Sequence, residues 1–102
     1  MTADPPRRAS FTVAPSSPCV DGHFPGNPVV PGAVLLAEAA SCLAAEGLAV
    51  TRIRRLKFRR PVAPGEAVEI EIAGGPGPAL IRWSAGGEPV AEARVEIGPA
   101  DA

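Results

Sequence analysis

The sequence predicts a single α+β domain in which one helix lies on an antiparallel sheet. One segment, 32–46, has the apolar pattern of a helix, and shorter segments on either side alternate polar and apolar residues as strands do. The segments after the helix are separated by turns rich in glycine and proline, which is typical of an antiparallel meander. A length of 102 residues fits one such domain.

The expected domain covers residues 9–98, between a disordered leader at 1–8 and a short tail at 99–102. Pro5 and Pro6 stand in series ahead of two arginines, and neighbouring prolines do not start regular structure. We therefore expect the first strand only after them.

Residues 9–14 predict that first strand, because Phe11 and Val13 alternate with polar residues. The following stretch, 15–31, contains five prolines, which exclude a helix and a central strand. It also carries apolar side chains such as Phe24 and Val30, unlike a flexible linker. We predict a fixed loop that packs against the core.

Residues 32–46 form the one good helix candidate, with Pro31 before it and Gly47 as its C-terminal stop. Polar residues interrupt it rarely, so the helix is apolar nearly all round. Such a helix is expected to be wrapped by other structure, here the sheet.

The rest of the chain reads as strands. Segment 67–73 alternates most cleanly, with apolar side chains inward and Glu69 and Glu71 outward. Segment 51–60 breaks strict alternation, which indicates a β-bulge. The full set of expected strands after the helix is 51–60, 67–73, 79–85 and 88–97, with turns at 61–65, 74–78 and 86–87.

The net charge of −1 argues against a general nucleic-acid partner, although six of the ten basic residues fall between Arg52 and Arg60. No apolar run approaches the roughly 20 residues that a membrane span needs. The N-terminus lacks the apolar core of a secretion signal. Cys19 and Cys42 have neither metal-ligand spacing nor a disulfide framework, so we expect free thiols, no metal site and a cytoplasmic protein.

His23 is the single histidine, in a proline-stiffened loop ahead of the helix. Histidine suits proton transfer near neutral pH. The N–H groups at a helix start can stabilise negative charge, such as that on a thioester oxygen becoming an enolate. On spacing alone, a structural histidine is the more common outcome.

The residues themselves carry more information than their spacing. Residues 23–32 read His-Phe-Pro-Gly-Asn-Pro-Val-Val-Pro-Gly, and residues 56–62 read Leu-Lys-Phe-Arg-Arg-Pro-Val, followed by Pro-Gly-Glu at 64–66. Both segments resemble the 3-hydroxyacyl-acyl-carrier-protein dehydratases, and the likeness covers about residues 20–72. The first motif is long and hard to meet by chance.

That resemblance implies a hotdog fold, in which an antiparallel sheet wraps a central helix, and a homodimer or higher oligomer whose sites combine residues of both subunits. It implies that His23 removes the proton α to the thioester carbonyl. The backbone N–H of Gly32 would bind the thioester oxygen, and the backbone carbonyl of Val29 would orient the imidazole. No cofactor is implied beyond the phosphopantetheine arm of the acyl carrier protein that carries the substrate.

The sequence departs from the family at its acidic residue. The family's Asp or Glu lies fourteen residues after the histidine, where this chain has Ala37. Either Ala33 is an insertion at the helix start and Glu38 is the acid, or the register is kept and the acid is lost. We favour Glu38, while a helix residue that simply reaches solvent is the alternative.

The basic segment 52–60 has two interpretations. It is either a solvated sheet face or a docking surface for an acidic acyl carrier protein, formed by Arg54, Arg55, Lys57, Arg59 and Arg60.

The expected function is dehydration of 3-hydroxyacyl carrier thioesters, a lyase reaction of fatty-acid or polyketide/aryl-polyene-type lipid synthesis. The alternative is a catalytically silent hotdog subunit that binds acyl carrier protein or a partner, and an acyl-thioesterase is less favoured. The residue at position 37 is the best support for a silent subunit.

Overall fold

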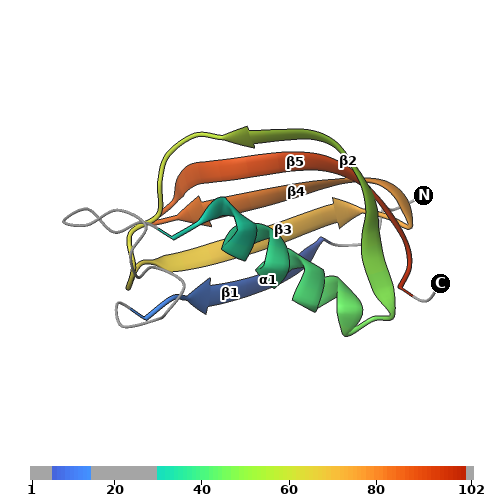
Figure 1. Ribbon diagram of the computed structural model, residues 1–102, viewed down its shortest axis with the longest axis horizontal. Helices are drawn as coiled ribbons and strands as arrows, with labels where there is room; N and C mark the ends of the chain where they lie inside the picture. Colours follow the sequence, from blue (N-terminus) through green and yellow to red (C-terminus); the bar gives the residue numbers. More distant parts are fainter. Residues whose placement is uncertain (1–5, 15–29, 101–102) are drawn as a thin grey trace.

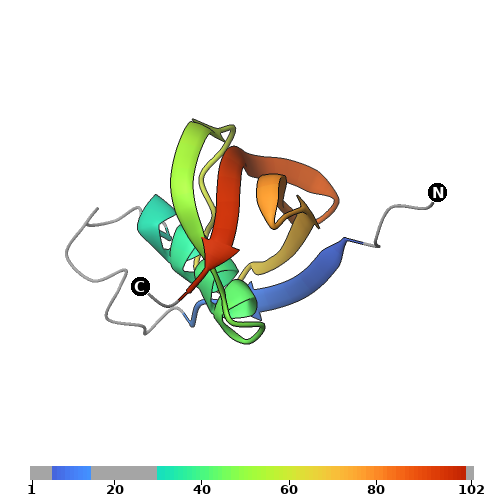
Figure 2. The same ribbon diagram turned by 90° about the vertical axis from the view of Figure 1, so that its right-hand side faces the viewer.

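The computed structural model describes residues 6–14 and 30–100, which form one antiparallel sheet and one helix. The strands follow the spatial order β1-β3-β4-β5-β2, and α1 lies across one face of the sheet (Figure 1). Viewed end-on, the sheet curves around the helix (Figure 2). The predicted α+β class and hotdog arrangement are confirmed. The elements are β1 (Arg7–Thr12), α1 (Gly32–Ala44), β2 (Leu48–Phe58), β3 (Ala67–Gly74), β4 (Gly77–Ala85) and β5 (Glu88–Pro99).

The core lies between α1 and the concave face of the sheet. The helix buries Leu35, Ala39 and Leu43, which are four residues apart and so share one face. Trp83 of β4 is 1% exposed, and its indole N–H donates to the Leu35 carbonyl at 2.9 Å, which satisfies the one polar atom of a large buried ring. The apolar residues of 67–73 point inward as predicted: Val68, Ile70 and Ile72 are buried.

Strand β1 begins at Arg7, so the expected leader at 1–8 extends two residues too far. Arg7 pairs with Ile72 in the ladder with β3, and its guanidinium donates to Glu46 at 2.6 Å. Arg8 pairs with Glu71, and their side chains form an ion pair at 3.0 Å. Arginine stems can lie along a sheet while their charged ends meet carboxylates, so two arginines are compatible with this edge strand.

The helix ends at Ala44, and β2 begins at Leu48, three residues before the expected start. Gly47 has a φ of 73°, the left-handed conformation in which glycine ends helices, as predicted. The apolar residues after it pair with the end of β5, as in Val50 with Ile97.

Two register shifts in β2 confirm the predicted bulge. They fall between Val50 and Arg52 and between Ile53 and Arg55, so Thr51 and Arg54 have no directly opposite partner in β5. Directly paired residues share a sheet face. Val50, Ile53 and Leu56 therefore face the helix side at a spacing of three rather than two.

Within the described ranges, no helix has the length and apolar character required to span a membrane.

Candidate functional site

A pocket of about 410 Å³ lies at the N-terminal end of α1, where the chain leaves β2. Gly32 is the first residue of the helix and lines the pocket. The N–H groups of a helix's first turn lack partners inside the helix, and their partial positive charge favours an anionic ligand atom. The lining residues are Val30, Gly32, Phe58, Arg59, Arg60, Pro61 and Val62.

Two buried valines fix the helix start against the segment that follows β2. Val30 is 6% exposed and Val62 is 2% exposed. The N–H of Val30 donates to the carbonyl of Val62 at 2.8 Å. The position of Gly32, two residues on, therefore depends on the 61–66 turn.

Phe58 packs directly on Gly32. A Cβ atom added to Gly32 would lie 2.5 Å from Cζ and 2.8 Å from Cε1 of the Phe58 ring. Only glycine fits this position with the ring where it is, which gives the glycine of the 23–32 motif a steric reason.

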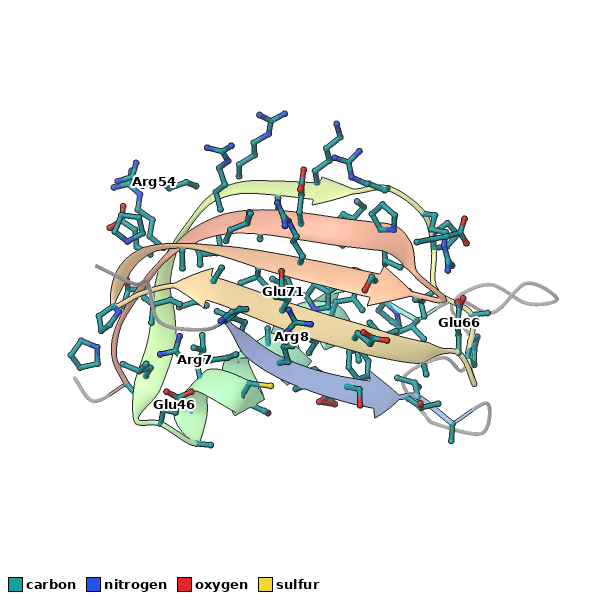
Figure 3. All side chains as sticks on the ribbon, turned by 180° about the vertical axis from the view of Figure 1, so that it is seen from behind. Arg7, Arg8, Glu46, Arg54, Glu66 and Glu71 are labelled. Atoms are coloured by element: carbon teal, nitrogen blue, oxygen red, sulfur yellow. The ribbon has the colours of Figure 1, made fainter. Side chains whose placement is uncertain are left out.

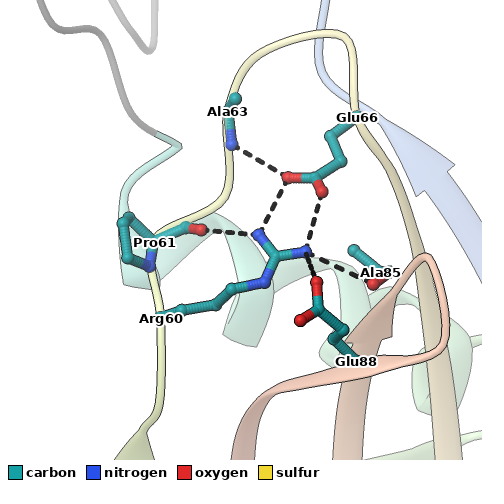
Figure 4. A network of polar contacts seen from close by, with 6 residues as sticks. All are labelled: Arg60, Pro61, Ala63, Glu66, Ala85 and Glu88. Carbon is teal, nitrogen blue, oxygen red and sulfur yellow. Dashed lines mark hydrogen bonds and ion pairs between the residues drawn. The ribbon is translucent and has the colours of Figure 1, made fainter.

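Arg60 holds the 61–66 turn in place through several contacts (Figure 4). Its guanidinium donates to both carboxylate oxygens of Glu66, at 3.1 and 2.8 Å, and to the carbonyls of Pro61 and Ala85. Glu88 lies 3.7 Å away as a second counter-ion. The hydrogen bond from Arg60 lowers the pKa of Glu66 from its ordinary value, and the N–H of Ala63 lowers it further.

A second hollow, about 560 Å³, separates α1 from the edge strand β2 and is named here the α1/β2 groove. Ala37 lines it and Glu38 does not. Successive helix residues are rotated by about 100°, so the half-buried Glu38 lies on a different flank of α1. The lining residues are Ala33, Leu36, Ala37, Ala40, Val50, Thr51, Arg52 and Ile53.

His23 and Val29 lie outside the described residues, as does Cys19. The structure thus places the predicted Gly32 in a pocket and Glu38 on α1. The predicted roles of His23 and Val29 stay predictions. Cys42, the one cysteine among the described residues, is half-buried on α1. The described residues contain no cluster of His, Cys, Asp or Glu suited to a metal ion.

Three of the five predicted docking residues hold ion pairs within the fold. Arg54 pairs with Glu96, Arg59 with Glu92 at 2.9 Å, and Arg60 with Glu66 at 2.8 Å. The structure records no ion pair for Arg55 or Lys57 with another described residue.

Arg55 and Lys57 instead join two arginines that sequence reasoning missed. With Arg82 of β4 and Arg94 of β5 they line a hollow of about 150 Å³, and these four residues are called the cation cluster below. Arg55 and Arg94 lie directly opposite each other in the ladder. They belong to the sheet face turned away from α1, the face that Figure 3 shows with Arg8 and Glu71 labelled. Only the strand order could have revealed them, because they come from three strands.

A family model described as ApeI-like, the ApeI dehydratase, matches residues 3–88. The 3-hydroxyacyl-acyl-carrier-protein dehydratase FabZ of Acetivibrio thermocellus is 30% identical, over 99% of this chain and 81% of the relative. FabZ of Zymomonas mobilis subsp. mobilis is 41% identical, over 56% of this chain and 44% of the relative. The chain spans about half the length of several curated relatives that it matches.

Solved structures share the fold. The dehydratase heterocomplex ApeI:P from Xenorhabdus doucetiae has a TM-score of 0.70 at 20% identity, covering 95% of this chain and 98% of that chain. An uncharacterized protein from Erwinia carotovora subsp. atroseptica has a TM-score of 0.72 at 20% identity, covering 97% and 94%. The resemblance expected from residues 23–32 and 56–66 is confirmed by the family model and the Acetivibrio relative together. The chain belongs to the ApeI-like family of dehydratases, related to FabZ.

Proposed function

We propose that this chain is a 3-hydroxyacyl-thioester dehydratase, which removes water from a 3-hydroxyacyl thioester to give the 2-enoyl thioester. The observation that carries the proposal is the family match over residues 3–88, which takes in both His23 and Gly32. The pocket at the start of α1 supports it, because Gly32 lines a partly apolar hollow at a helix N-terminus. The substrate is proposed to arrive on the phosphopantetheine arm of an acyl carrier protein.

In the proposed mechanism, the thioester oxygen accepts a hydrogen bond from the Gly32 N–H. His23, oriented by the carbonyl of Val29, takes the proton from C2. Negative charge that develops on the oxygen is stabilised by the helix N-terminus. The C3–O bond breaks as an acid protonates the leaving hydroxyl, and the C2–H electron pair becomes the C2–C3 double bond.

The proposed acid is Glu38, the one acidic side chain in α1. In a homodimer it would act on the site of the partner. The α1/β2 groove is proposed below as the contact with another chain, and it is lined by Ala37 and not by Glu38. This placement favours a second candidate: a subunit without its own acid that works with a different chain. The dehydratase heterocomplex among the structural neighbours joins two kinds of chain, by its name.

One assay separates these candidates. The purified full chain is given 3-hydroxybutanoyl pantetheine thioester, and enoyl thioester is measured. Activity in the wild type, reduced about 10²–10⁴-fold in kcat/KM by His23→Ala, is the expected result for loss of a general base. The exposed substitution Thr12→Ala is the control.

Loss of activity in Glu38→Gln would assign Glu38 as the acid, while full activity would place the acid elsewhere. No enoyl product from the chain alone, with product appearing when a second dehydratase-fold chain is added, would favour the silent or accessory subunit. No product under either condition contradicts the dehydratase proposal.

A second copy of the chain is the proposed partner along the α1/β2 groove. The groove is apolar, and Ile53 on its rim is 47% exposed although it faces the helix side. Strand β2 is also an edge of the sheet, with backbone groups open to pairing on one side. Burial of such a surface is what an oligomer interface provides.

The proposed docking surface for the acyl carrier protein is the cation cluster together with Arg54, Arg59 and Arg60. The four cations surround Glu92, which also pairs with Arg59 at 2.9 Å, and Glu71 lies 3.9 Å from Arg82. The area keeps more cations than carboxylates on a chain whose net charge is −1. An acidic protein is the complementary partner. A reducing, cytoplasmic setting is proposed from the sequence alone, because Cys19 and Cys42 form no disulfide framework.

A further inference from the structure

Phe58 is one of two large hydrophobic side chains that remain exposed in the described part of the chain. It is 53% exposed, and Ile53 is 47% exposed. The two lie on the same strand but line different hollows: Ile53 the α1/β2 groove, Phe58 the pocket at Gly32. An exposed ring in a pocket wall is placed to contact whatever enters the pocket.

The ring is positioned by fixed backbone on both sides. Phe58 pairs with Ala91 at the end of the β2–β5 ladder. The next N–H, that of Arg59, donates to the Val90 carbonyl at 2.7 Å. Arg60 then fastens the chain through its contacts with Glu66 and the Ala85 carbonyl. The ring is therefore attached to a segment with little freedom to move away.

The close approach to Gly32 decides what the ring can contact. The ring lies against the Cα of Gly32, since a Cβ there would sit 2.5 Å from Cζ. The Gly32 nitrogen is bonded to that same Cα. Gly32 and Phe58 also line the same pocket, so a thioester held by the Gly32 N–H shares that pocket with the Phe58 ring.

We propose that Phe58 is a specificity-determining residue that selects 3-hydroxyacyl thioesters without a branch at C2. The inference rests on the proposed function, in which the Gly32 N–H binds the thioester oxygen. C2 is bonded to the thioester carbonyl carbon, so a methyl group on C2 meets the ring. Dehydration of a 2-methyl substrate is otherwise possible, because C2 still carries one proton and C3 still carries the leaving hydroxyl.

The test compares 3-hydroxybutanoyl and 2-methyl-3-hydroxybutanoyl pantetheine thioesters as substrates of the full chain. The wild type should prefer the unbranched thioester by about 10- to 200-fold in kcat/KM, the range that one carbon group produces in an apolar pocket. Phe58→Ala should reduce this ratio by about tenfold or more. Phe58→Leu, a smaller change to the wall, serves if the alanine variant does not fold.

The matched control is Phe11→Ala. It also removes an aromatic ring from an edge strand, but Phe11 is half-buried and does not line the pocket. Its substrate ratio should equal that of the wild type even if the protein is less stable. Circular dichroism of each variant confirms that the fold is kept.

A second arm uses the steric contact itself. Gly32→Ala should lower kcat/KM, because the added methyl group meets the ring. Adding Phe58→Ala should restore part of the lost activity, since the space is then open. If Gly32 is required only for approach of the substrate to the backbone, the second substitution restores nothing.

The outcomes separate the two proposals. Absence of enoyl product from the unbranched thioester, both with the chain alone and with a second dehydratase-fold chain added, is evidence against the proposed function. Normal activity on that thioester, with one substrate ratio for the wild type, Phe58→Ala and Phe58→Leu and no rescue of Gly32→Ala, overturns the role of Phe58 alone.

Discussion

Two glycines with positive φ, Gly47 and Gly74, stand at the ends of elements and differ in what surrounds them. At Gly47, with φ 73°, a Cβ would meet no heavy atom within 4 Å. At Gly74, with φ 98°, it would lie 2.7 Å from the Pro78 carbonyl oxygen and 3.1 Å from the Cα of Ala79. The first position demands glycine for its backbone conformation only, and the second also for space.

Gly47→Ala should therefore cost about 1–2 kcal/mol of unfolding free energy, the penalty of left-handed backbone for an alanine. Gly74→Ala should cost about 1–3 kcal/mol more, because backbone atoms must move to admit the methyl group. Urea unfolding of the two variants measures the difference. Equal losses would mean that the β3–β4 turn adjusts freely.

At the scale of single residues, the sequence predicted the importance of Gly32 but not its contact. The motif at 23–32 pointed to its N–H, while the steric reason comes from Phe58, twenty-six positions later. Position 37 stands out in the sequence as a departure from the family. That Ala37 lines the α1/β2 groove and Glu38 does not required the helix to be placed against β2.

Among the elements, the turn at 61–66 lines the pocket and contacts the segment that leads into α1. Arg60 and Glu66 close it, and the Val62 carbonyl inside it holds the N–H of Val30. The ion pair therefore supports the start of α1 indirectly, through the turn that holds the Val30 N–H. Sequence alone predicted the turn, but not its link to the β4–β5 hairpin through the Ala85 carbonyl and Glu88.

The Arg60–Glu66 pair makes stability depend on pH in a defined direction. The folded-state pKa of Glu66 lies below its ordinary value of 4.5, first because of the Arg60 hydrogen bond. Stability from this group is therefore present above about pH 4.5 and lost as pH falls through the folded-state pKa. The stability difference between wild type and Glu66→Gln should be largest near pH 7 and should shrink below pH 4.5.

Urea unfolding at several pH values measures that difference. Glu69→Gln, which removes an exposed carboxylate from neighbouring β3, controls for the change in net charge. A wild-type advantage over Glu66→Gln that stays constant down to the lowest pH would exclude the ion pair as its source.

Element boundaries were predicted less well than element types. The helix, the cleanly alternating strand at 67–73 and the bulged strand all exist as expected. The start of β2 was missed because Leu48, Ala49 and Val50 continue the apolar composition of the helix. The start of β1 was missed because arginine pairs rarely mark strands, and Glu46 and Glu71, distant in sequence, stabilise this one.

Across the whole molecule, basic residues that are far apart in the sequence gather on one face of the sheet. The cation cluster combines residues of β2, β4 and β5, and Arg55 directly opposes Arg94. Like charges facing each other across a ladder are unfavourable by themselves. An acidic partner docked there would relieve the repulsion, in keeping with the proposed carrier protein.

The double variant Arg55→Ala/Lys57→Ala should raise the KM for carrier-bound substrate several-fold at low ionic strength, and the effect should fade with added salt. The KM for a free pantetheine thioester should not change. Arg8→Ala removes a charge from the same sheet face at the opposite edge and is the control. Equal effects of the double variant on carrier-bound and free substrates would assign these residues to something other than docking.

The two bulges of β2 also bear on how this chain can vary in length. Thr51 and Arg54 each lack a direct partner, so loss of either would straighten the strand locally and leave the pairing of Phe58 with Ala91 unchanged. Residues 56–58 include no such unpaired residue. Loss of one of them would therefore turn the neighbouring side chains to the opposite face of the sheet. A deletion in the first half of β2 would thus leave the pocket unchanged. The number of residues in 56–58, by contrast, must stay constant.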